Sequence, residues 1–428
     1  MRLDQTDEAR NLLMELLNRD PLNGGALLTL SYLQARQGDI ELARDILKET
    51  VPGLVQPLGS DRLVPRYLLL VFLEAPFEVL LQDADILLVR SVTAVDSDLL
   101  GSTSVKFVGT ATIGTDHIDN DWLNSAGIGF ASAPGSNANS VAEYVIAAIL
   151  EISERYETDL KDKSIGIIGA GNVGSRVALK AGFLGMNVLL NDPPLSRRTA
   201  DPVYLPLEDL LECDFITMHT PLTHEGPDRT FHLADSDFFS SMKPGAVFIN
   251  TSRGPVTDGR ALKKAIKKKT VASAVLDVWE GEPAVDCGLL QMTDIATPHI
   301  AGYSFDGKVR GMFMLYEQVC RFFDVESVCG IDQFLPEPYV PELKLTGGEG
   351  IESVLLHAVR QIYDIVQDDR NLRLMLDIPG PKRGYFFDHC RKTYPVRREF
   401  QNTSVLFEDC DMEIRKAIAG IGFNVDGR

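Results

Sequence analysis

Short apolar runs alternate with longer amphipathic stretches over most of the chain. Each run is bounded by polar residues or glycine, which is typical of buried parallel strands. The runs occur at 67–72, 85–90, 106–109 and 127–130 and, after a helix predicted over 140–155, at 164–168, 187–190, 215–218, 246–249 and 272–276. This alternation predicts an α/β protein with two doubly wound, Rossmann-like domains.

The two ends of the chain follow other patterns. Apolar residues recur with helical spacing through the first fifty positions, which predicts helices there. The segment 21–52 resembles one helix pair of a tetratricopeptide repeat. Such repeats usually need about three copies to bury a continuous core, so this helical extension is either a docking element for a protein partner or an incidental appendage. A proline-rich stretch over 335–341 predicts a linker to a small α+β domain, which begins with a helix over 353–367.

These patterns predict four segments. They are a helical extension over 1–55, a substrate-binding domain over 56–140 that is completed by 300–333, a nucleotide-binding domain over 141–299, and a C-terminal domain over 334–428.

Composition narrows the class of function. The 428 residues carry a formal net charge of -19, which repels phosphate backbones and anionic headgroups, so neither nucleic acid nor a membrane is an expected partner. The one basic run, at 263–269, ends an amphipathic stretch and predicts a solvated helix end. With no signal-peptide pattern at the N-terminus and no long apolar span, a cytoplasmic protein is expected. The six cysteines are scattered and include no Cys-x-x-Cys pair, so we predict no metal site.

A glycine motif follows the predicted strand at 164–168. Gly169, Gly171 and Gly174 have G-x-G-x-x-G spacing, and they enclose Asn172 and Val173. A helical pattern begins at this motif, and such a strand-to-helix context is what distinguishes a dinucleotide site from a plain turn. Glycines let the backbone approach a pyrophosphate, and the helix N-terminus supplies N–H donors.

Asp192 ends the next predicted strand, at the distance expected of the acidic residue in this fingerprint. Its carboxylate can accept hydrogen bonds from ribose hydroxyls and would repel a 2′-phosphate, which favours NAD over NADP. The nearby Arg197 and Arg198 would soften that preference.

Three polar segments follow the later strands, at 250–254, 277–283 and 297–303. In open α/β sheets ligands bind at this carboxyl end of the strands. Oxidation of a secondary alcohol needs a base for the hydroxyl proton, a group that supports the base, and a cation for the carboxylate; His299, Glu282 and Arg253 supply them. Taken singly, Arg253 could form a surface ion pair and His299 could be a core histidine. Their joint placement favours a catalytic set.

The three segments and the glycine motif together resemble the D-isomer-specific 2-hydroxyacid dehydrogenase family, from about residue 83 to the C-terminus. The likeness is greatest to members that oxidise a phosphorylated four-carbon acid, and it rests on 88–93, 107–117, 276–283 and 297–303. The resemblance implies that Arg253 orients the substrate carboxylate and that Glu282 hydrogen-bonds His299, the acid/base. It also implies NAD as cofactor and a homodimer formed through the C-terminal domain.

The resemblance extends to residues around the reaction centre. It implies that Ser91, Thr112 and Tyr303 contact the substrate, and that Asp192, Thr220, Asp277 and Gly302 line the NAD site. Independently of it, Arg90 is a candidate for the substrate phosphate, because an anionic ligand in so acidic a protein needs nearby cations.

The chain departs from the family before residue 83. A run at 67–72 can stand in for the first strand, but too few residues follow it for the usual first helix and loop. Three functions therefore stay open: the phosphorylated four-carbon acid, another 2-hydroxy acid such as 3-phosphoglycerate, or an NAD-binding scaffold without turnover.

Overall fold

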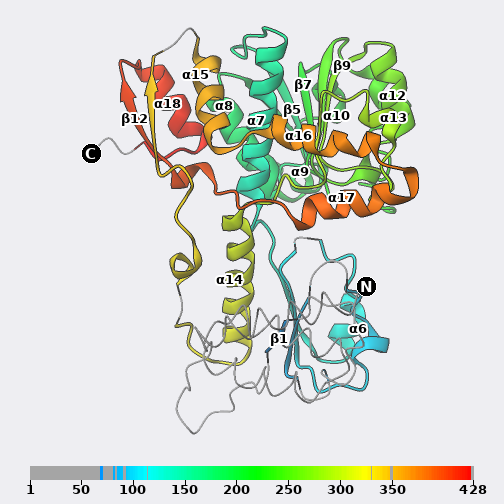
Figure 1. Cartoon of the computed structure of the whole chain (residues 1–428). Coiled ribbons are helices and arrows are strands. Elements are labelled where there is room, and N and C mark those ends of the chain that lie inside the picture. Colours follow the sequence, from blue (N-terminus) through cyan, green and yellow to red (C-terminus); the bar gives the residue numbers. More distant parts are fainter. Residues whose placement is uncertain are drawn as a thin grey trace. The chain divides into compact units, whose positions relative to one another are not determined.

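The computed structural model (Figure 1) describes residues 81, 84–89, 93–112, 114–328, 330–347 and 350–425, together with the short strand β1 (Leu68–Leu70). The predicted helical extension over 1–55 lies outside the described residues, as do Arg90 and Ser91. The contacts divide the described chain into two compact units. Unit 1 contains the residues up to Pro134 and Met312–Val328, and unit 2 contains Gly135–Gly311 and the residues after Val328. The predicted four-segment division stays a prediction.

Unit 1 is built on a parallel four-stranded sheet in the order β1-β2-β3-β4. Its further strands are β2 (Ile86–Val89), β3 (Phe107–Thr110) and β4 (Gly129–Ser132), and its helices are α5 (Ser97–Leu100) and α6 (Asn120–Ser125). Side chains alternate between the two faces of the sheet, so Leu87 and Val108 enter one core while Leu88 and Phe107 enter another with Leu315. Leu315 belongs to α14 (Phe305–Phe322), whose C-terminal part therefore completes this unit.

Unit 2 contains a parallel six-stranded sheet in the order β10-β9-β8-β7-β5-β6. The strands are β5 (Ser164–Ile168), β6 (Asn187–Asn191), β7 (Phe215–Met218), β8 (Ala246–Asn250), β9 (Val271–Leu276) and β10 (Ile295–Ala296). The strand order reverses at β5, which pairs with both β6 and β7. Five of these strands, β5 to β9, lie where the apolar runs predicted strands. The sixth, β10, was not predicted, because two residues are too short to show a period.

Helices connect and cover these strands (Figure 1). In chain order they are α7 (Ala138–Arg155), α8 (Asn172–Phe183), α9 (Pro193–Thr199), α10 (Leu207–Leu211), α11 (Ser236–Ser241), the 3-10 turn η1 (Gly254–Val256), α12 (Gly259–Lys267) and α13 (Cys287–Leu290). Helix α7 is buried over nearly its whole length because apolar residues line every face. The basic run forms the end of α12, with Lys267 and Lys268 exposed as predicted. In the described part of the chain no helix could span a membrane.

The C-terminal segment is of α+β type, as predicted. It contains η2 (Ile331–Phe334), β11 (Glu342–Thr346), α15 (Ile351–Ile362), α16 (Ile365–Arg373), η3 (Leu374–Asp377), η4 (Gly380–Lys382), α17 (Arg383–Lys392), η5 (Phe400–Asn402), β12 (Ser404–Glu408) and α18 (Met412–Ile421). The single helix predicted over 353–367 is wrong. The first helix ends where Tyr363 becomes extended, and the Asp364 carboxylate caps α16 by accepting from the Gln367 amide.

This segment shares its core with the six-stranded sheet. Helix α15 packs on α7 and α18 packs on α8, so Phe400 and Ile418 join Val145 and Ile167 in one apolar cluster. Figure 1 shows α15 and α18 beside these helices. The six-stranded sheet and the C-terminal segment thus belong to one packed body.

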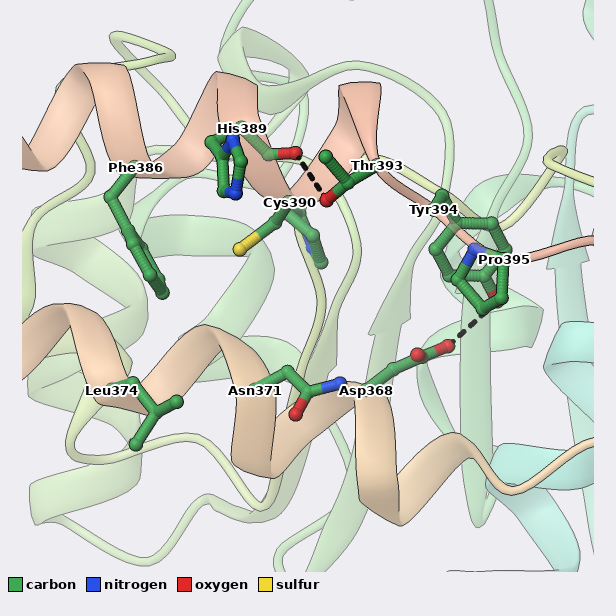
Figure 2. Close-up of a pocket in the computed structure, with 10 residues that line it drawn as sticks. Asp368, Asn371, Leu374, Phe386, His389, Cys390, Thr393, Tyr394 and Pro395 are labelled. Carbon is green, nitrogen blue, oxygen red and sulfur yellow. Dashed lines mark hydrogen bonds between the residues drawn. The ribbon is translucent and has the colours of Figure 1, made fainter.

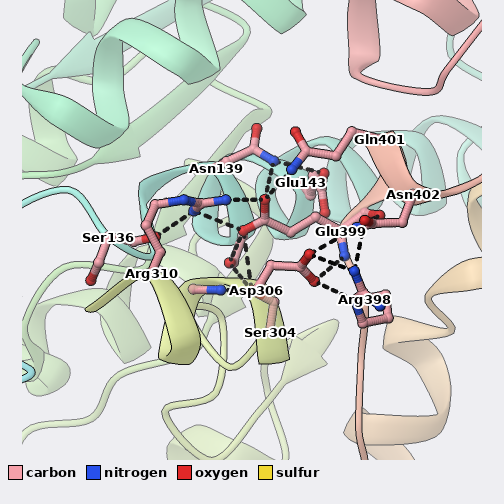
Figure 3. Close-up of polar contacts among 12 residues, drawn as sticks. Ser136, Asn139, Glu143, Ser304, Asp306, Arg310, Arg398, Glu399, Gln401 and Asn402 are labelled. Carbon is pink, nitrogen blue, oxygen red and sulfur yellow. Dashed lines mark hydrogen bonds and ion pairs between the residues drawn. The ribbon is translucent and has the colours of Figure 1, made fainter. Parts of the chain in front are cut away.

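Buried ion pairs reinforce this join (Figure 3). Arg398 pairs with Asp306 at 2.9 Å, and the fully buried Glu399 pairs with Arg310 at 3.0 Å. Arg310 also donates to the carbonyl of Ser136 at 2.6 Å. The C-terminal segment therefore binds the start of α14 and the residues just before α7, close in sequence to two of the three places where the chain passes between the units.

Candidate active site

The three predicted catalytic residues follow adjacent strands of the six-stranded sheet. Arg253 comes after β8, Glu282 lies in the loop after β9, and His299 comes after β10. Because parallel strands end at the same edge, this topology brings the three segments together. All three residues belong to unit 2.

His299 and Glu282 form a direct pair. The His299 Nδ1 lies 2.8 Å from Glu282 Oε2, and the side chains are 33% and 21% exposed. Glu282 is fixed in turn by the Trp279 amide, which donates to its Oε1 at 2.6 Å. A carboxylate on Nδ1 selects the tautomer whose Nε2 carries the lone pair. Nε2 has no hydrogen-bond partner among the described residues, so it can act as a base.

Asp277 anchors the loop that carries His299. Its Oδ1 accepts from the Thr297 hydroxyl at 2.6 Å and from the Ile300 amide at 2.7 Å, and its Oδ2 accepts from the Ala301 amide at 2.9 Å. The carboxylate is buried, with 1% of the residue exposed. His299 itself has a φ of 58°, a left-handed conformation that costs free energy in a non-glycine residue. These hydrogen bonds offset that cost and fix the position of the His299 backbone, and with it that of the imidazole.

The Arg253 loop is held against the Glu282 loop. Asn250, the last residue of β8, holds the start of this loop, since its Nδ2 donates to the Arg253 carbonyl at 3.1 Å. A Cβ at Gly254 would lie 2.0 Å from the Trp279 backbone, so only glycine permits this approach. The Arg253 Nη1 donates to the Ser252 carbonyl at 2.8 Å. Within the described residues no carboxylate pairs with its guanidinium, which leaves donors for an anionic ligand.

The glycine motif forms a tight turn between β5 and α8. Gly169 has a φ of 91°, and a Cβ at Gly174 would lie 2.0 Å from the Gly169 carbonyl oxygen. Nothing lies within 4 Å of the place where a Cβ of Gly171 would stand. Asn172 and Val173 open α8. The turn thus presents open backbone at a helix N-terminus, as a pyrophosphate requires.

Other atoms around this turn fit a bound dinucleotide. The Thr220 Oγ1 and the Asn137 Oδ1 are buried without a hydrogen-bond partner among the described residues, so each has capacity to hydrogen-bond a bound dinucleotide. Asp192 follows β6, and its two oxygens accept one amide each, from Ala170 and Leu195 at 2.9 Å. Each carboxylate oxygen can accept a further hydrogen bond, so Asp192 can also bind a ribose hydroxyl.

Three further residues near the predicted NAD site have well-defined surroundings. A Cβ at Gly302 would lie 2.1 Å from the Asn137 Nδ2, so a larger residue there would require the Asn137 side chain to move. Arg197 is ion-paired with Asp228. Burial lowers the pKa of His219, beside Thr220, to about 3, so this imidazole stays neutral.

The predicted substrate contacts are divided between the units. Tyr303 lies in unit 2, and its hydroxyl has no hydrogen-bond partner among the described residues. Thr112 lies in unit 1, where its Oγ1 is 2.7 Å from the Thr110 hydroxyl and donates to the Gly114 carbonyl at 2.9 Å. Ser91 and Arg90 are outside the described residues.

Several supporting residues escaped prediction from the sequence. The Trp279 indole donates to the Thr297 carbonyl at 2.9 Å, and the Tyr144 hydroxyl lies 2.7 Å from Thr297 Oγ1. The Arg397 Nη2 donates to the Ala301 carbonyl at 2.7 Å. The sequence carries no signal for these contacts, because Tyr144 and Arg397 are far from the loop along the chain.

A cavity of about 210 Å³ lies behind this loop (Figure 2). Pro298 lines it from the loop, and residues of α16, η3, α17 and the turn after α17 line the remainder. Tyr394 donates to Asp368 at 2.8 Å on its wall, and burial raises the pKa of Asp368 to about 6. Within the described residues, no group of three metal-binding side chains gathers here or elsewhere.

Comparison with known proteins decides the family. Residues 142–301 match the NAD binding domain of D-isomer specific 2-hydroxyacid dehydrogenases, and residues 334–420 match a domain of unknown function. Erythronate-4-phosphate dehydrogenase of Escherichia coli O17:K52:H18 is 43% identical over 80% of this chain and 89% of its own length. The chain belongs to the erythronate-4-phosphate dehydrogenase family. The enzyme of Hahella chejuensis with the same name is 40% identical over 81% of this chain and 91% of its own length.

Membership in the erythronate-4-phosphate dehydrogenase family confirms the predicted NAD-dependent dehydrogenase and its cofactor. The fold agrees as well. The TT0316 protein of Thermus thermophilus superimposes with a TM-score of 0.50 at 26% identity, over 57% of this chain and 86% of that one. The tetratricopeptide-like character of the first residues has no support in these comparisons.

Proposed function

We propose that the enzyme oxidises the C2 hydroxyl of 4-phospho-D-erythronate to the ketone of 2-oxo-3-hydroxy-4-phosphobutanoate, as a step in the synthesis of pyridoxal 5′-phosphate. The observation that carries the proposal is the His299–Glu282 pair, at the edge of an NAD-binding sheet that also presents Arg253. The substrate follows from the name of relatives that match this chain over most of its length.

In this reaction the C2 hydroxyl loses its proton to Nε2 of His299. The Nδ1–H remains bonded to Glu282 at 2.8 Å, so the imidazolium that forms lies against a carboxylate. This contact favours the charged imidazole in the transition state, where the proton is in transfer.

Arg253 binds the C1 carboxylate and the C2 oxygen. Its free guanidinium donors suit a planar carboxylate, and they would stabilise the partial negative charge that develops on the C2 oxygen as the proton leaves. The substrate thereby presents its C2 hydroxyl to His299.

When bound, NAD would supply the hydride acceptor for the two-electron oxidation at C2. The turn of Gly169, Gly171 and Gly174 would hold its pyrophosphate, and Asp192 would hold its adenosine ribose. Thr220, with its buried unpartnered hydroxyl, would donate to the dinucleotide.

Other parts of the proposal come from the sequence resemblance. Ser91, Thr112 and Tyr303 would contact the substrate, and the C-terminal segment would form a homodimer in the cytoplasm. Light scattering of the purified protein would test the dimer. Removal of residues 1–60, followed by activity measurement, would test whether the N-terminal extension serves a protein partner instead of catalysis.

Reduction of NAD, followed by absorbance, tests the activity. The enzyme is incubated with 4-phospho-D-erythronate, with 3-phospho-D-glycerate and with D-erythronate. We expect the highest kcat/KM with 4-phospho-D-erythronate and a loss of about 10² to 10⁴ in kcat for His299→Ala. A higher kcat/KM for 3-phospho-D-glycerate would refute the substrate assignment. No NAD reduction with any of the three acids would refute the activity.

A further inference from the structure

Two cations gather over the ring of Tyr303. The Lys308 Nζ lies 4.7 Å from the ring centroid, and the Arg391 Cζ lies 5.9 Å from it. Tyr303 itself is four residues beyond His299, in the same loop. Both cations therefore contact a residue of the loop that carries the catalytic base, in a protein whose net charge is -19.

Arg391 has unused hydrogen-bonding capacity. Its Nε is buried without a partner, and its nearest carboxylate among the described residues is that of Asp388, at 3.9 Å from Nη1. Asp368, on α16, accepts from the Tyr394 hydroxyl at 2.8 Å. The ring of Tyr394 meets that of Tyr303 edge-on, with centroids 5.9 Å apart. A buried guanidinium nitrogen without an acceptor is costly unless a ligand completes it.

From these contacts we infer that Arg391 and Lys308 bind the phosphate of the substrate, with the Tyr303 hydroxyl as a further donor. The inference rests on the proposed function, because it needs a substrate with a second anionic group. Arg253 serves the carboxylate, so the phosphate requires other cations, and Arg391 and Lys308 would add to Arg90, which the sequence predicts for the same group. Arginine and lysine together supply positive charge to balance the phosphate and N–H donors for its oxygens.

The inference assigns a task to the C-terminal segment. Arg391 lies on α17, within the residues that match a domain of unknown function, and Lys308 lies beyond the end of the general dehydrogenase match at residue 301. The general domain would perform the oxidation, while these later residues would select a phosphorylated acid.

Steady-state kinetics with a pair of substrates tests this. We expect Arg391→Met to raise KM for 4-phospho-D-erythronate by about 10- to 100-fold with kcat changed by no more than about threefold, since the lost contact is made equally in the ground state. Lys308→Met should act in the same direction. The kcat/KM for D-erythronate, which lacks the phosphate, should stay within about twofold. Arg391→Lys should recover part of the loss, because it restores the charge without the fork of donors.

Lys392→Met is the matched control, because this exposed residue adjoins Arg391 on α17 and has no described partner. It should leave all constants unchanged. Equal losses on both substrates for Arg391→Met, or no loss on either, would overturn the inference while the proposed function stood. If the unaltered enzyme fails to oxidise 4-phospho-D-erythronate, the proposed function fails and the inference fails with it. Inhibition by inorganic phosphate provides a direct readout: its inhibition constant should rise in Arg391→Met and remain unchanged in Lys392→Met.

Discussion

The backbone carbonyl of Asp277 accepts the amide hydrogen of His299 at 2.7 Å, while the carboxylate of the same Asp277 accepts the next two amides, those of Ile300 and Ala301. One residue at the end of β9 thus fixes the whole turn that carries the base. The sequence resemblance assigned Asp277 to the NAD site, and that role stays a prediction. Its hydrogen bonds add a second task, which is to hold His299 in its left-handed conformation.

Replacement of Asp277 by Asn should therefore impair both stability and catalysis. The amide nitrogen would meet the Ala301 N–H, donor against donor, inside a buried site. We expect a loss of about 1–3 kcal/mol in the free energy of unfolding, measured by urea titration, and a fall in kcat of at least about tenfold. Stability equal to that of the unaltered enzyme would show that the anchor is not Asp277.

Glu282 is predicted to act through His299 alone. Glu282→Gln keeps the shape and one acceptor oxygen, but it removes the charge opposite the imidazolium that forms in the transition state. We expect kcat to fall by about 10²-fold, with KM for both substrates within about threefold. The unfolding free energy controls for damage to the Trp279 contact. A large rise in KM with kcat retained would instead place Glu282 in substrate binding.

Asp192 is predicted to set the affinity and choice of cofactor. In Asp192→Asn the side-chain oxygen can still cap α9 through the Leu195 amide, but the new amide group would oppose the Ala170 N–H and repel no 2′-phosphate. We expect KM for NAD to rise by about tenfold and the preference for NAD over NADP to shrink, with kcat for NAD nearly unchanged.

Asp209→Asn, in the exposed first turn of α10, provides the control for loss of one surface carboxylate. An unaltered ratio of kcat/KM for the two cofactors in Asp192→Asn would assign the preference to other residues.

The strands were predictable, and the residues of the candidate site could be proposed, because each depends on local patterns. Apolar runs mark β5 to β9, and the residues after each run include Arg253, Asp277 and the glycine turn. Parallel topology then places these residues at one edge without further information. The strand β10 and the break between α15 and α16 were missed, because a two-residue strand has no period and the break depends on a single cap at Asp364.

Contacts between distant parts of the chain were beyond sequence reasoning. Arg397 and Tyr144 hold the catalytic loop from positions far away along the chain, and Arg391 reaches Tyr303 from α17. Nothing local to these residues distinguishes them from surface arginines or core tyrosines. Only tertiary packing brings them to the loop: Tyr144 comes with α7, and Arg391 comes with α17, which packs on α16 beside β10.

The buried carboxyl of Glu143 should make stability depend on pH (Figure 3). Burial, with the neighbouring charge of Glu399, raises the pKa of Glu143 to about 8, and Lys180 and Arg397 only partly oppose this. The folded state therefore holds a proton that the unfolded chain releases near its ordinary value. Stability from this group is fully present below about pH 4.5 and is lost as pH rises toward about 8.

Glu143→Gln should flatten that dependence, since the amide cannot ionise while its oxygen still accepts from the Phe400 amide, as Glu143 does at 2.9 Å. Thermal unfolding between pH 5 and pH 9, in about one-unit steps, measures the effect. We expect the difference in melting temperature, variant minus unaltered enzyme, to grow with pH by a few degrees, about the shift that 1 kcal/mol produces in a chain of this size. Glu413→Gln, on the exposed first turn of α18, controls for loss of a carboxylate. Parallel curves for Glu143→Gln and the unaltered enzyme would mean that the proton is held elsewhere.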